Sequence, residues 1–239
     1  MEKVKEEVLY KYSFYQPVDG YRYSIDALLL AGFVKGKKDK DKVKVFDIGT
    51  GSGIITLLIS KRFPDWEFSA VEIQQDLSEL AKENFQLHKL EVDLFNCDYR
   101  DLEGQDSYDI IVSNPPFFNQ GHQPSNQQTA IARHEIHGDM ESMIKKAKKL
   151  LKSGGYFYVI YPAVRLSELL TKLSNDKLAP YAIKPIYPKP GMEATLVIVV
   201  AKKNYKGRLQ VLSPLYIGDS SGNDTKEIKD LYEKGVLEW

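Results

Sequence analysis

The stretch that decides the fold is Asp47-Ile48-Gly49-Thr50-Gly51-Ser52-Gly53. It is preceded by an apolar run, Val43-Lys44-Val45-Phe46, that is typical of a buried strand, and it is followed by residues 54–63, whose apolar pattern is typical of a helix. Three glycines on alternate positions let the backbone turn sharply between strand and helix and approach a ligand closely. The first turn of the helix adds unpaired N–H groups that favour an anionic group. The stretch therefore predicts an α/β protein with a ligand site at the glycine turn.

The alternation of strands and helices continues along the chain. Further strands are expected at residues 68–71, 92–95, 108–112 and 156–161, and further helices at 76–88 and 139–151, with Gly154-Gly155 stopping the second. Such an alternation predicts a doubly wound, mostly parallel, Rossmann-like sheet with helices on both faces. Ligands bind such sheets at the carboxyl ends of the strands, so the residues that follow each strand are the first candidates for a site.

Two regions lie outside this alternation. Residues 1–42 are expected to form a Tyr-rich N-terminal arm, a short apolar helix around Ile25–Phe33 and a charged linker. Residues 43–239 are expected to form a single globular unit. Near its end, residues 181–187 and 195–201 flank Pro188-Lys189-Pro190-Gly191, which predicts an antiparallel C-terminal strand pair joined by a turn.

The composition argues against several classes of protein. Lys plus Arg and Asp plus Glu both number 33, so no uniform positive field marks a nucleic-acid partner, and such a partner must meet a local patch. Cys97 is the single cysteine, which fits a reducing, cytoplasmic compartment. Residues 1–7 are charged and no apolar stretch follows them, while the longest aliphatic run, 194–201, is too short to span a bilayer. We expect neither export nor membrane insertion.

Two acidic residues follow the next two strands. Glu72 could accept hydrogen bonds from both ribose hydroxyls of a nucleoside cofactor, and this spacing suits NAD as well as S-adenosylmethionine. Asp98 could accept from the adenine amine, with Ile73 and Tyr99 on the two faces of the ring. The structural alternatives are a glycine turn needed only for packing and a solvated loop aspartate.

Asn114-Pro115-Pro116-Phe117 follows the fourth strand. An amine conjugated to a ring is a poor nucleophile because its lone pair is delocalised. If the Asn114 side-chain oxygen and the Pro115 carbonyl each accept one N–H, the lone pair is aimed at the incoming methyl group, and catalysis comes from positioning and fixed dipoles. The prolines stiffen the loop, and Phe117 offers a face for a flipped base. The structural alternative is a proline turn that ends a strand beside a core phenylalanine.

The order of these motifs, DIGTGSG, VEI, CD and NPPF, resembles that of class I methyltransferases acting on planar amino groups, over roughly residues 43–161. The resemblance implies that S-adenosylmethionine is the cofactor and that residues 43–239 form the methyltransferase domain. The positions that match the cofactor site of the family are Asp47, Gly49, Gly51, Gly53, Glu72 and Asp98. The positions that match its catalytic motif are Asn114, Pro115, Pro116 and Phe117.

NPPF does not choose among adenine N6, guanine N2 and a glutamine amide as the acceptor. Residues 23–31 (YSIDALLLA) and 130–135 (AIARHE) are similar to the bacterial family that methylates N6 of the adenine beside the anticodon of valine tRNA. Tyr187-Pro188-Lys189 with Glu193-Ala194 extends the similarity almost to the end of the chain. The resemblance implies adenine-N6 methylation in RNA, with tRNA as the partner. An NAD-dependent oxidoreductase and an RNA-binding protein without turnover stay open as alternatives.

Several cations are candidates for contacts with RNA phosphates. Residues after the last strands are expected to flank the rim of the cleft, and the cations there are Lys189, Lys202, Lys203, Lys206 and Arg208. Arg133 adds a guanidinium whose fork of donors suits phosphate. The lysine run between residues 145 and 152 is interpreted as a solvated helix face. His134 is interpreted as a packing or capping residue, and since the histidines and Cys97 lack metal-ligand spacing, we expect no metal.

Overall fold

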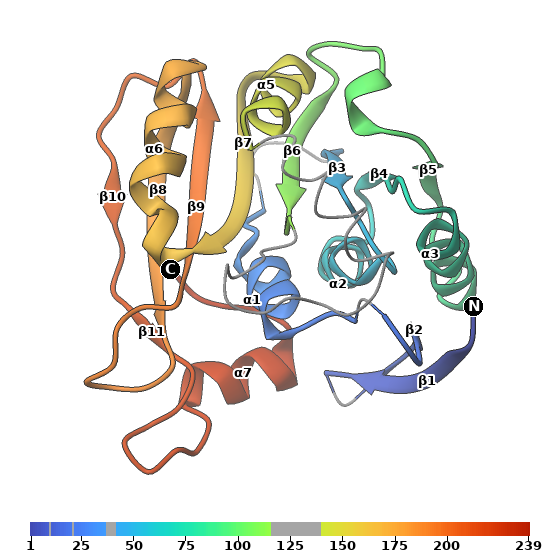
Figure 1. Ribbon diagram of the computed structural model, residues 1–239, viewed down its shortest axis with the longest axis horizontal. Coiled ribbons are helices and arrows are strands. Elements are labelled where there is room, and N and C mark those ends of the chain that lie inside the picture. Colours follow the sequence, from blue (N-terminus) through green and yellow to red (C-terminus); the bar gives the residue numbers. More distant parts are fainter. Residues whose placement is uncertain (10, 21, 37–41, 116–139) are drawn as a thin grey trace.

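A central sheet carries the fold of the computed structural model, which describes residues 1–9, 11–20, 22–36, 42–115 and 140–239 (Figure 1). Within these residues the sheet has nine strands in the order β10-β8-β9-β7-β6-β3-β4-β5, with β11 also paired to β8. The parallel core consists of β3 (Lys44–Ile48), β4 (Glu67–Val71), β5 (Val92–Phe95), β6 (Tyr108–Ser113) and β7 (Leu151–Pro162). The α/β, doubly wound and mostly parallel sheet predicted from the sequence is confirmed.

One strand runs against the others. β9 (Leu196–Lys203) is antiparallel both to β7 and to β8 (Leu178–Tyr187), which confirms the predicted C-terminal strand pair. Because Leu196 pairs with Pro162 and Lys202 pairs with Tyr156, β9 begins at the edge where the parallel strands end. It therefore ends at the opposite edge of the sheet.

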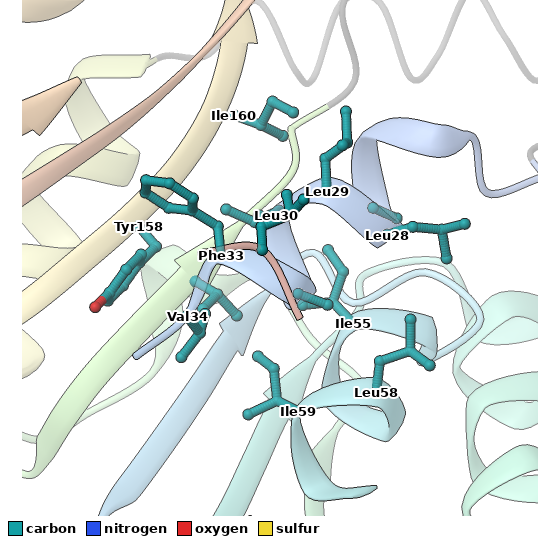
Figure 2. Packing of buried hydrophobic residues seen from close by; sticks show 14 of the residues in the cluster. Leu28, Leu29, Leu30, Phe33, Val34, Ile55, Leu58, Ile59, Tyr158 and Ile160 are labelled. Atoms are coloured by element: carbon teal, nitrogen blue, oxygen red, sulfur yellow. The ribbon is translucent and has the colours of Figure 1, made fainter. Parts of the chain in front are cut away.

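Helices cover both faces of the sheet and bury two separate apolar clusters (Figure 1). α1 (Ile25–Phe33), α2 (Ile54–Arg62) and α7 (Lys226–Lys234) contribute to one cluster, and α5 (Met140–Leu150) and α6 (Leu166–Asn175) contribute to the other. In the first cluster Leu29 and Phe33 of α1 lie close to α2 and to Tyr158 and Ile160 of β7 (Figure 2). The helix α1 is thus part of the first apolar cluster. No helix in the described part of the chain is long and apolar enough to cross a bilayer.

The sequence analysis predicted that the pair Gly154-Gly155 stops a helix before a new strand, but the pair lies within strand β7. β7 begins five residues earlier than expected, at Leu151, which pairs with Tyr108. The register between β6 and β7 then shifts, so that Ile110 pairs with Tyr156. Gly154 has a φ of 74°, a conformation that other residues rarely adopt, and this lets the strand continue on both sides of the irregularity.

The two ends of the chain add elements that the sequence analysis did not predict. At the start, β1 (Lys3–Val8) and β2 (Tyr12–Pro17) form an antiparallel hairpin, and β2 contacts α3 (Gln75–Leu87). At the other end, β10 (Gln210–Val211) and β11 (Leu215–Tyr216) precede α7. The segment after α7 reaches α1, where the ring of Trp239 stacks on Phe33 with centroids 4.5 Å apart and its Nε1 donates to the Phe33 carbonyl over 2.8 Å.

Candidate active site

The glycine turn after β3 has the geometry that its sequence predicts. Gly49, Gly51 and Gly53 have φ values of 73°, 58° and 90°, which residues with a side chain rarely adopt. The Gly49 N–H donates to the Val71 carbonyl over 2.9 Å, so the turn is fastened to the end of β4. A Cβ on Gly53 would lie 2.7 Å from the Phe85 ring, whereas a Cβ on Gly49 would meet nothing within 4 Å. The turn thus packs tightly on α3 at one end and leaves space at the other.

Glu72, at the end of β4, lies against this turn. Its carboxylate accepts hydrogen bonds from the main-chain N–H of Gly51 over 2.9 Å and from that of Gln74 over 2.8 Å. Burial raises the pKa of the Glu72 carboxyl, and the main-chain amides oppose that rise. Asn96, which the sequence analysis missed, donates to the carbonyls of Glu72 (2.8 Å) and Ile73 (3.3 Å) and so fixes the same segment from the end of β5.

Asp47 is fully buried where β3 meets the turn. The hydroxyls of Thr50 and Thr56 donate to its Oδ2 over 2.7 and 2.8 Å, whereas its Oδ1 has no hydrogen-bond partner among the described residues. Burial raises the pKa of Asp47 to about 6, and the two hydroxyls oppose the rise. Buried acceptors in native proteins are nearly always paired, so the orphaned oxygen indicates a place for a donor group of a bound molecule.

The Asp98 carboxylate, which follows β5, already has a partner within the protein. Asp98 precedes the short helix η1 (Tyr99–Asp101), and its carboxylate accepts from the Arg100 main-chain N–H and Nε, each at 2.8 Å at the closest, and from Nη2. The hydrogen bond from Arg100 lowers the pKa of Asp98. Ile73, next to Glu72, is 45% exposed, which leaves an apolar surface for a ring, and Tyr99 packs against the α5 side of the core.

Lys146 holds η1 in place from α5. Its Nζ donates to the carbonyls of Arg100 and Leu102, each over 2.8 Å, and the residue is buried. The interpretation of the lysine run as a solvated face is therefore wrong for Lys146. Its spacing from Met143 and Leu150 places it on the buried stripe of α5, a signal that was present in the sequence.

Asn114 and Pro115 follow β6, the neighbour of β3. Asp47 pairs with Val112 across the two strands, and Ser113 Oγ donates to the Ile48 carbonyl over 2.8 Å. Asn114, which is buried, therefore follows the end of β6, and this end is hydrogen-bonded to the end of β3, where the glycine turn begins. The other residues that the sequence analysis assigned to this region, Pro116, Phe117, Arg133 and His134, lie outside the described residues.

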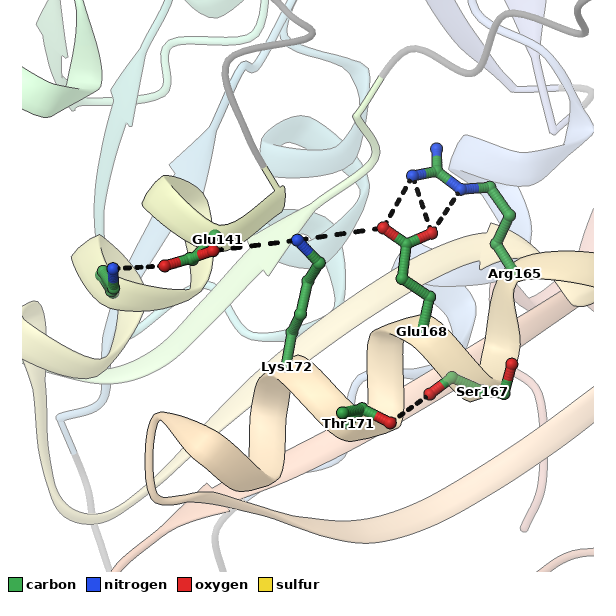
Figure 3. A network of polar contacts seen from close by, with 7 residues as sticks. Glu141, Arg165, Ser167, Glu168, Thr171 and Lys172 are labelled. Carbon is green, nitrogen blue, oxygen red and sulfur yellow. Dashed lines mark hydrogen bonds and ion pairs between the residues drawn. The ribbon is translucent and has the colours of Figure 1, made fainter.

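Charged side chains link the start of α5 to the last turn of α6 (Figure 3). Lys172 lies 3.9 Å from Glu141 of α5 and 3.9 Å from Glu168 of its own helix. Glu168 also pairs with Arg165 of η2 (Ala163–Arg165) at 2.9 Å. Exposed pairs of this kind add little stability singly.

The cations after β9 do not lie where the sequence analysis expected them. Lys202 is paired with Tyr156, so residues 202–208 lie at the edge of the sheet opposite to Asn114. Lys202 Nζ donates to the Tyr156 hydroxyl over 2.9 Å, and Lys203 Nζ donates to Asp106 (2.9 Å) and to the carbonyl of Leu151 (2.7 Å). The expectation that Lys202, Lys203, Lys206 and Arg208 flank the rim of the cleft is wrong, because β9 runs antiparallel.

Lys189 is the exception in that group. It lies in the connection between β8 and β9, and the pairing of Leu196 with Pro162 places this connection at the carboxyl edge of the parallel strands. Among the described residues, no group of three His, Cys, Asp or Glu side chains is arranged to hold a metal ion.

The structure combines a doubly wound sheet with a glycine turn after its first parallel strand, an acidic residue after the next strand and Asn-Pro after the fourth. These features define a class I methyltransferase that uses S-adenosylmethionine. The chain belongs to the methyltransferase small domain family, whose model matches residues 26–175.

Similar proteins agree with this class. A curated relative from Flavobacterium psychrophilum, "tRNA1(Val) (adenine(37)-N6)-methyltransferase", is 27% identical over 81% of this chain and 84% of its own length. A predicted O-methyltransferase from Agrobacterium tumefaciens has a similar fold, with a TM-score of 0.69 and 21% identity over 90% of this chain and 98% of that one. A putative class I S-adenosylmethionine-dependent methyltransferase from Listeria monocytogenes has a TM-score of 0.57 and 17% identity, over 88% and 68% of the two chains.

Proposed function

We propose that this methyltransferase transfers a methyl group from S-adenosylmethionine to N6 of an adenine in RNA, and that the acceptor is the adenine next to the anticodon of valine tRNA. The observation that carries the proposal is the position of Asn114-Pro115, at the end of a strand adjacent to the one that opens the glycine turn. The name of the Flavobacterium psychrophilum relative supports adenine over a guanine or a glutamine amide, which the same motif would also hold. A tRNA substrate supports the proposal that the protein acts in the cytoplasm.

The residues around the glycine turn fit the donor molecule. The orphaned Oδ1 of Asp47 would accept from its ammonium group, and the open space at Gly49 leaves room for its amino-acid end. Glu72 would accept from the ribose hydroxyls, and Ile73 would cover one face of the adenine. When bound, S-adenosylmethionine supplies an electrophilic methyl group on a positively charged sulfur.

Asp98 is proposed to accept from the donor's adenine amine, as its match to the family motif implies. Because Arg100 already occupies both carboxylate oxygens, the amine would have to share an oxygen with Arg100 or displace one of its N–H groups. Arg100 thus orients the carboxylate and also competes for it. Tyr99 is proposed for the second face of the ring.

On the acceptor side, we propose that the Asn114 side-chain oxygen and the Pro115 carbonyl hold the two N–H groups of the target amine. Pro116 would lock the loop, and Phe117 would stack on the flipped adenine. Arg133 and Lys189 are proposed to contact the neighbouring phosphates. The lysines and arginine at residues 202–208 are left out of this proposal because they lie at the other edge of the sheet.

The test is methylation of two transcripts of valine tRNA that differ only in carrying adenine or guanine beside the anticodon, with ribosomal RNA as a third substrate. We expect N6-methyladenosine in the first transcript alone. Methylation of the guanine transcript to the same extent, or N2-methylguanosine in ribosomal RNA as the only product, would contradict the proposed acceptor while leaving the donor site intact.

A further inference from the structure

Asn84, near the end of α3, joins three segments of the chain through one buried side chain. Its Oδ1 accepts from the Tyr15 main-chain N–H over 2.7 Å, and its Nδ2 donates to the carbonyls of Tyr15 and Ser52, each over 2.9 Å. Asn84 is fully buried, and both of its N–H groups are used. The N-terminal hairpin, α3 and the glycine turn therefore meet at this amide.

The contact with Tyr15 resembles a strand pairing. Tyr15 lies opposite Lys5 in the hairpin, and both its N–H and its C=O are paired with the Asn84 amide. The next residue of α3, Phe85, packs against Gly53 so closely that a Cβ there would lie 2.7 Å away. Asn84 and Phe85 of α3 thus hold Ser52 and Gly53 of the glycine turn. The position of the Asn84 side chain in turn depends on the hairpin.

The hairpin also fixes the entry to α1. Gln16, which is buried, accepts from the Tyr23 main-chain N–H over 3.0 Å, and the rings of Phe14 and Tyr23 are in edge contact with centroids 5.8 Å apart. The hairpin is therefore held in place both by α3 and by the residues that lead into α1. Asn84 connects it to the glycine turn.

We infer that Asn84 is a positioning residue that makes the N-terminal hairpin part of the donor site, an inference that rests on the proposed placement of the donor at the glycine turn. If Tyr15 withdraws, the Asn84 oxygen and one N–H lose their partners inside the protein, which is costly. The amide then turns toward water and releases the Ser52 carbonyl, and the turn is no longer held in its binding conformation. By linkage, donor binding strengthens hairpin docking by the same factor.

The first experiment measures S-adenosylhomocysteine affinity by calorimetry. Asn84→Asp keeps the size of the side chain and the oxygen facing Tyr15 but removes both N–H groups, and we expect it to weaken binding about tenfold, as the loss of a buried hydrogen bond does. The matched control is His88→Ala, which removes a 2.6 Å contact with the Ser13 carbonyl of the same hairpin one turn further along α3. The control is expected to stay within about twofold of wild type, because Asn84 still holds both Tyr15 and the Ser52 carbonyl in this variant.

The second experiment needs no variant and measures amide hydrogen exchange of the wild-type protein with and without S-adenosylhomocysteine. We expect slower exchange both in residues 49–54 and in the hairpin at residues 12–17. Protection of the turn without protection of the hairpin would overturn the inference, as would wild-type affinity in Asn84→Asp. Failure of the wild-type protein to bind S-adenosylhomocysteine would instead refute the proposed donor site itself.

Discussion

The main-chain N–H of Gly51 donates a 2.9 Å hydrogen bond to Glu72 Oε2, so the glycine turn after β3 holds the carboxylate of the residue that follows β4. The carboxylate is oriented before any ligand arrives, which saves the cost of ordering it on binding. The function of Glu72 and the conformation of the turn are therefore coupled.

Glu72→Gln is expected to weaken donor binding by about tenfold or more, because an amide presents an N–H to one of the two main-chain donors that the carboxylate now accepts from. Calorimetry with S-adenosylhomocysteine measures the effect. Glu79→Gln, at an exposed position of α3, is the control that should bind normally. Unchanged affinity in Glu72→Gln would mean that the ribose is bound elsewhere.

Asn114→Ala is expected to lower turnover by about 10²–10³, the usual effect of losing one fixed hydrogen-bonding group in an active site. Donor affinity should stay close to wild type, because the side chain is assigned to the acceptor amine. Single-turnover methylation and donor calorimetry separate the two effects. A variant that methylates tRNA within a few-fold of the wild-type rate would exclude the proposed positioning of the amine.

Asp47 is expected to make stability fall as pH rises. Its folded pKa of about 6 lies above the ordinary 3.8, so the folded state binds the proton more tightly than the unfolded state does. The stabilisation is complete below about pH 4 and is lost as pH rises through 6, amounting to about 3 kcal/mol by neutral pH. Urea unfolding at pH 5 and pH 7.5 spans the last part of this fall, about 1.4 kcal/mol, which should appear in wild type and not in Asp47→Asn.

The same carboxylate gives donor binding the opposite dependence on pH. An ammonium group favours ionised Asp47, so affinity for S-adenosylhomocysteine should decrease as pH falls through about 6. Asp47→Asn should bind weakly at every pH. Affinity that does not change between pH 5 and pH 7.5 in the wild-type protein would contradict the contact with Asp47.

Lys146→Met is expected to weaken donor binding several-fold, because methionine fills the same space but cannot donate to the carbonyls of Arg100 and Leu102. η1 would then be held less firmly behind Asp98. Lys149→Met, at an exposed position of the same helix, is the matched control. Equal affinities in the two variants would show that η1 keeps its position without Lys146.

Lys189 and Lys203 are expected to behave differently on substitution. Lys189→Ala should weaken RNA binding and reduce its salt dependence by about one unit of slope, as the loss of one phosphate contact does. Lys203→Met should lower the melting temperature and leave RNA binding unchanged, because its ammonium holds Asp106 and main-chain carbonyls at the other edge. Filter binding at several salt concentrations and thermal unfolding separate the two outcomes.

The sequence predicted those parts of the fold that depend on short-range patterns. The turn at residues 47–53 follows from the spacing of its glycines, and the bounds of α1 and β5 follow from apolar runs of the right length. The C-terminal helix α7 also carried a signal, since Thr225 caps its start and Gly235 ends it. Its apolar residues Ile228 and Leu231 have helical spacing.

Features set by distant contacts could not be predicted in the same way. The edge of the sheet at which Lys202 lies depends on the direction of β9 relative to β7, and no local pattern encodes that direction. The hairpin at residues 3–17 turns through Leu9, whose φ of 50° is unusual for leucine, so it lacks the usual glycine or asparagine signal. The pairing of Asp98 with Arg100 depends on η1, and a helix of three residues is too short to be predicted from a sequence pattern.

The packing of residues 237–239 on α1 has a consequence for the order in which the protein is made. α1 is complete when residue 33 has been synthesised, but the Leu237 N–H and the Trp239 indole bind the carbonyls of Gly32 and Phe33 at its end. The 206 residues from 34 to 239 take roughly 10–40 seconds to translate at about 5–20 residues per second. During that interval one face of Phe33 lacks its stacking partner, so α1 is among the last of the described helices to be fully covered.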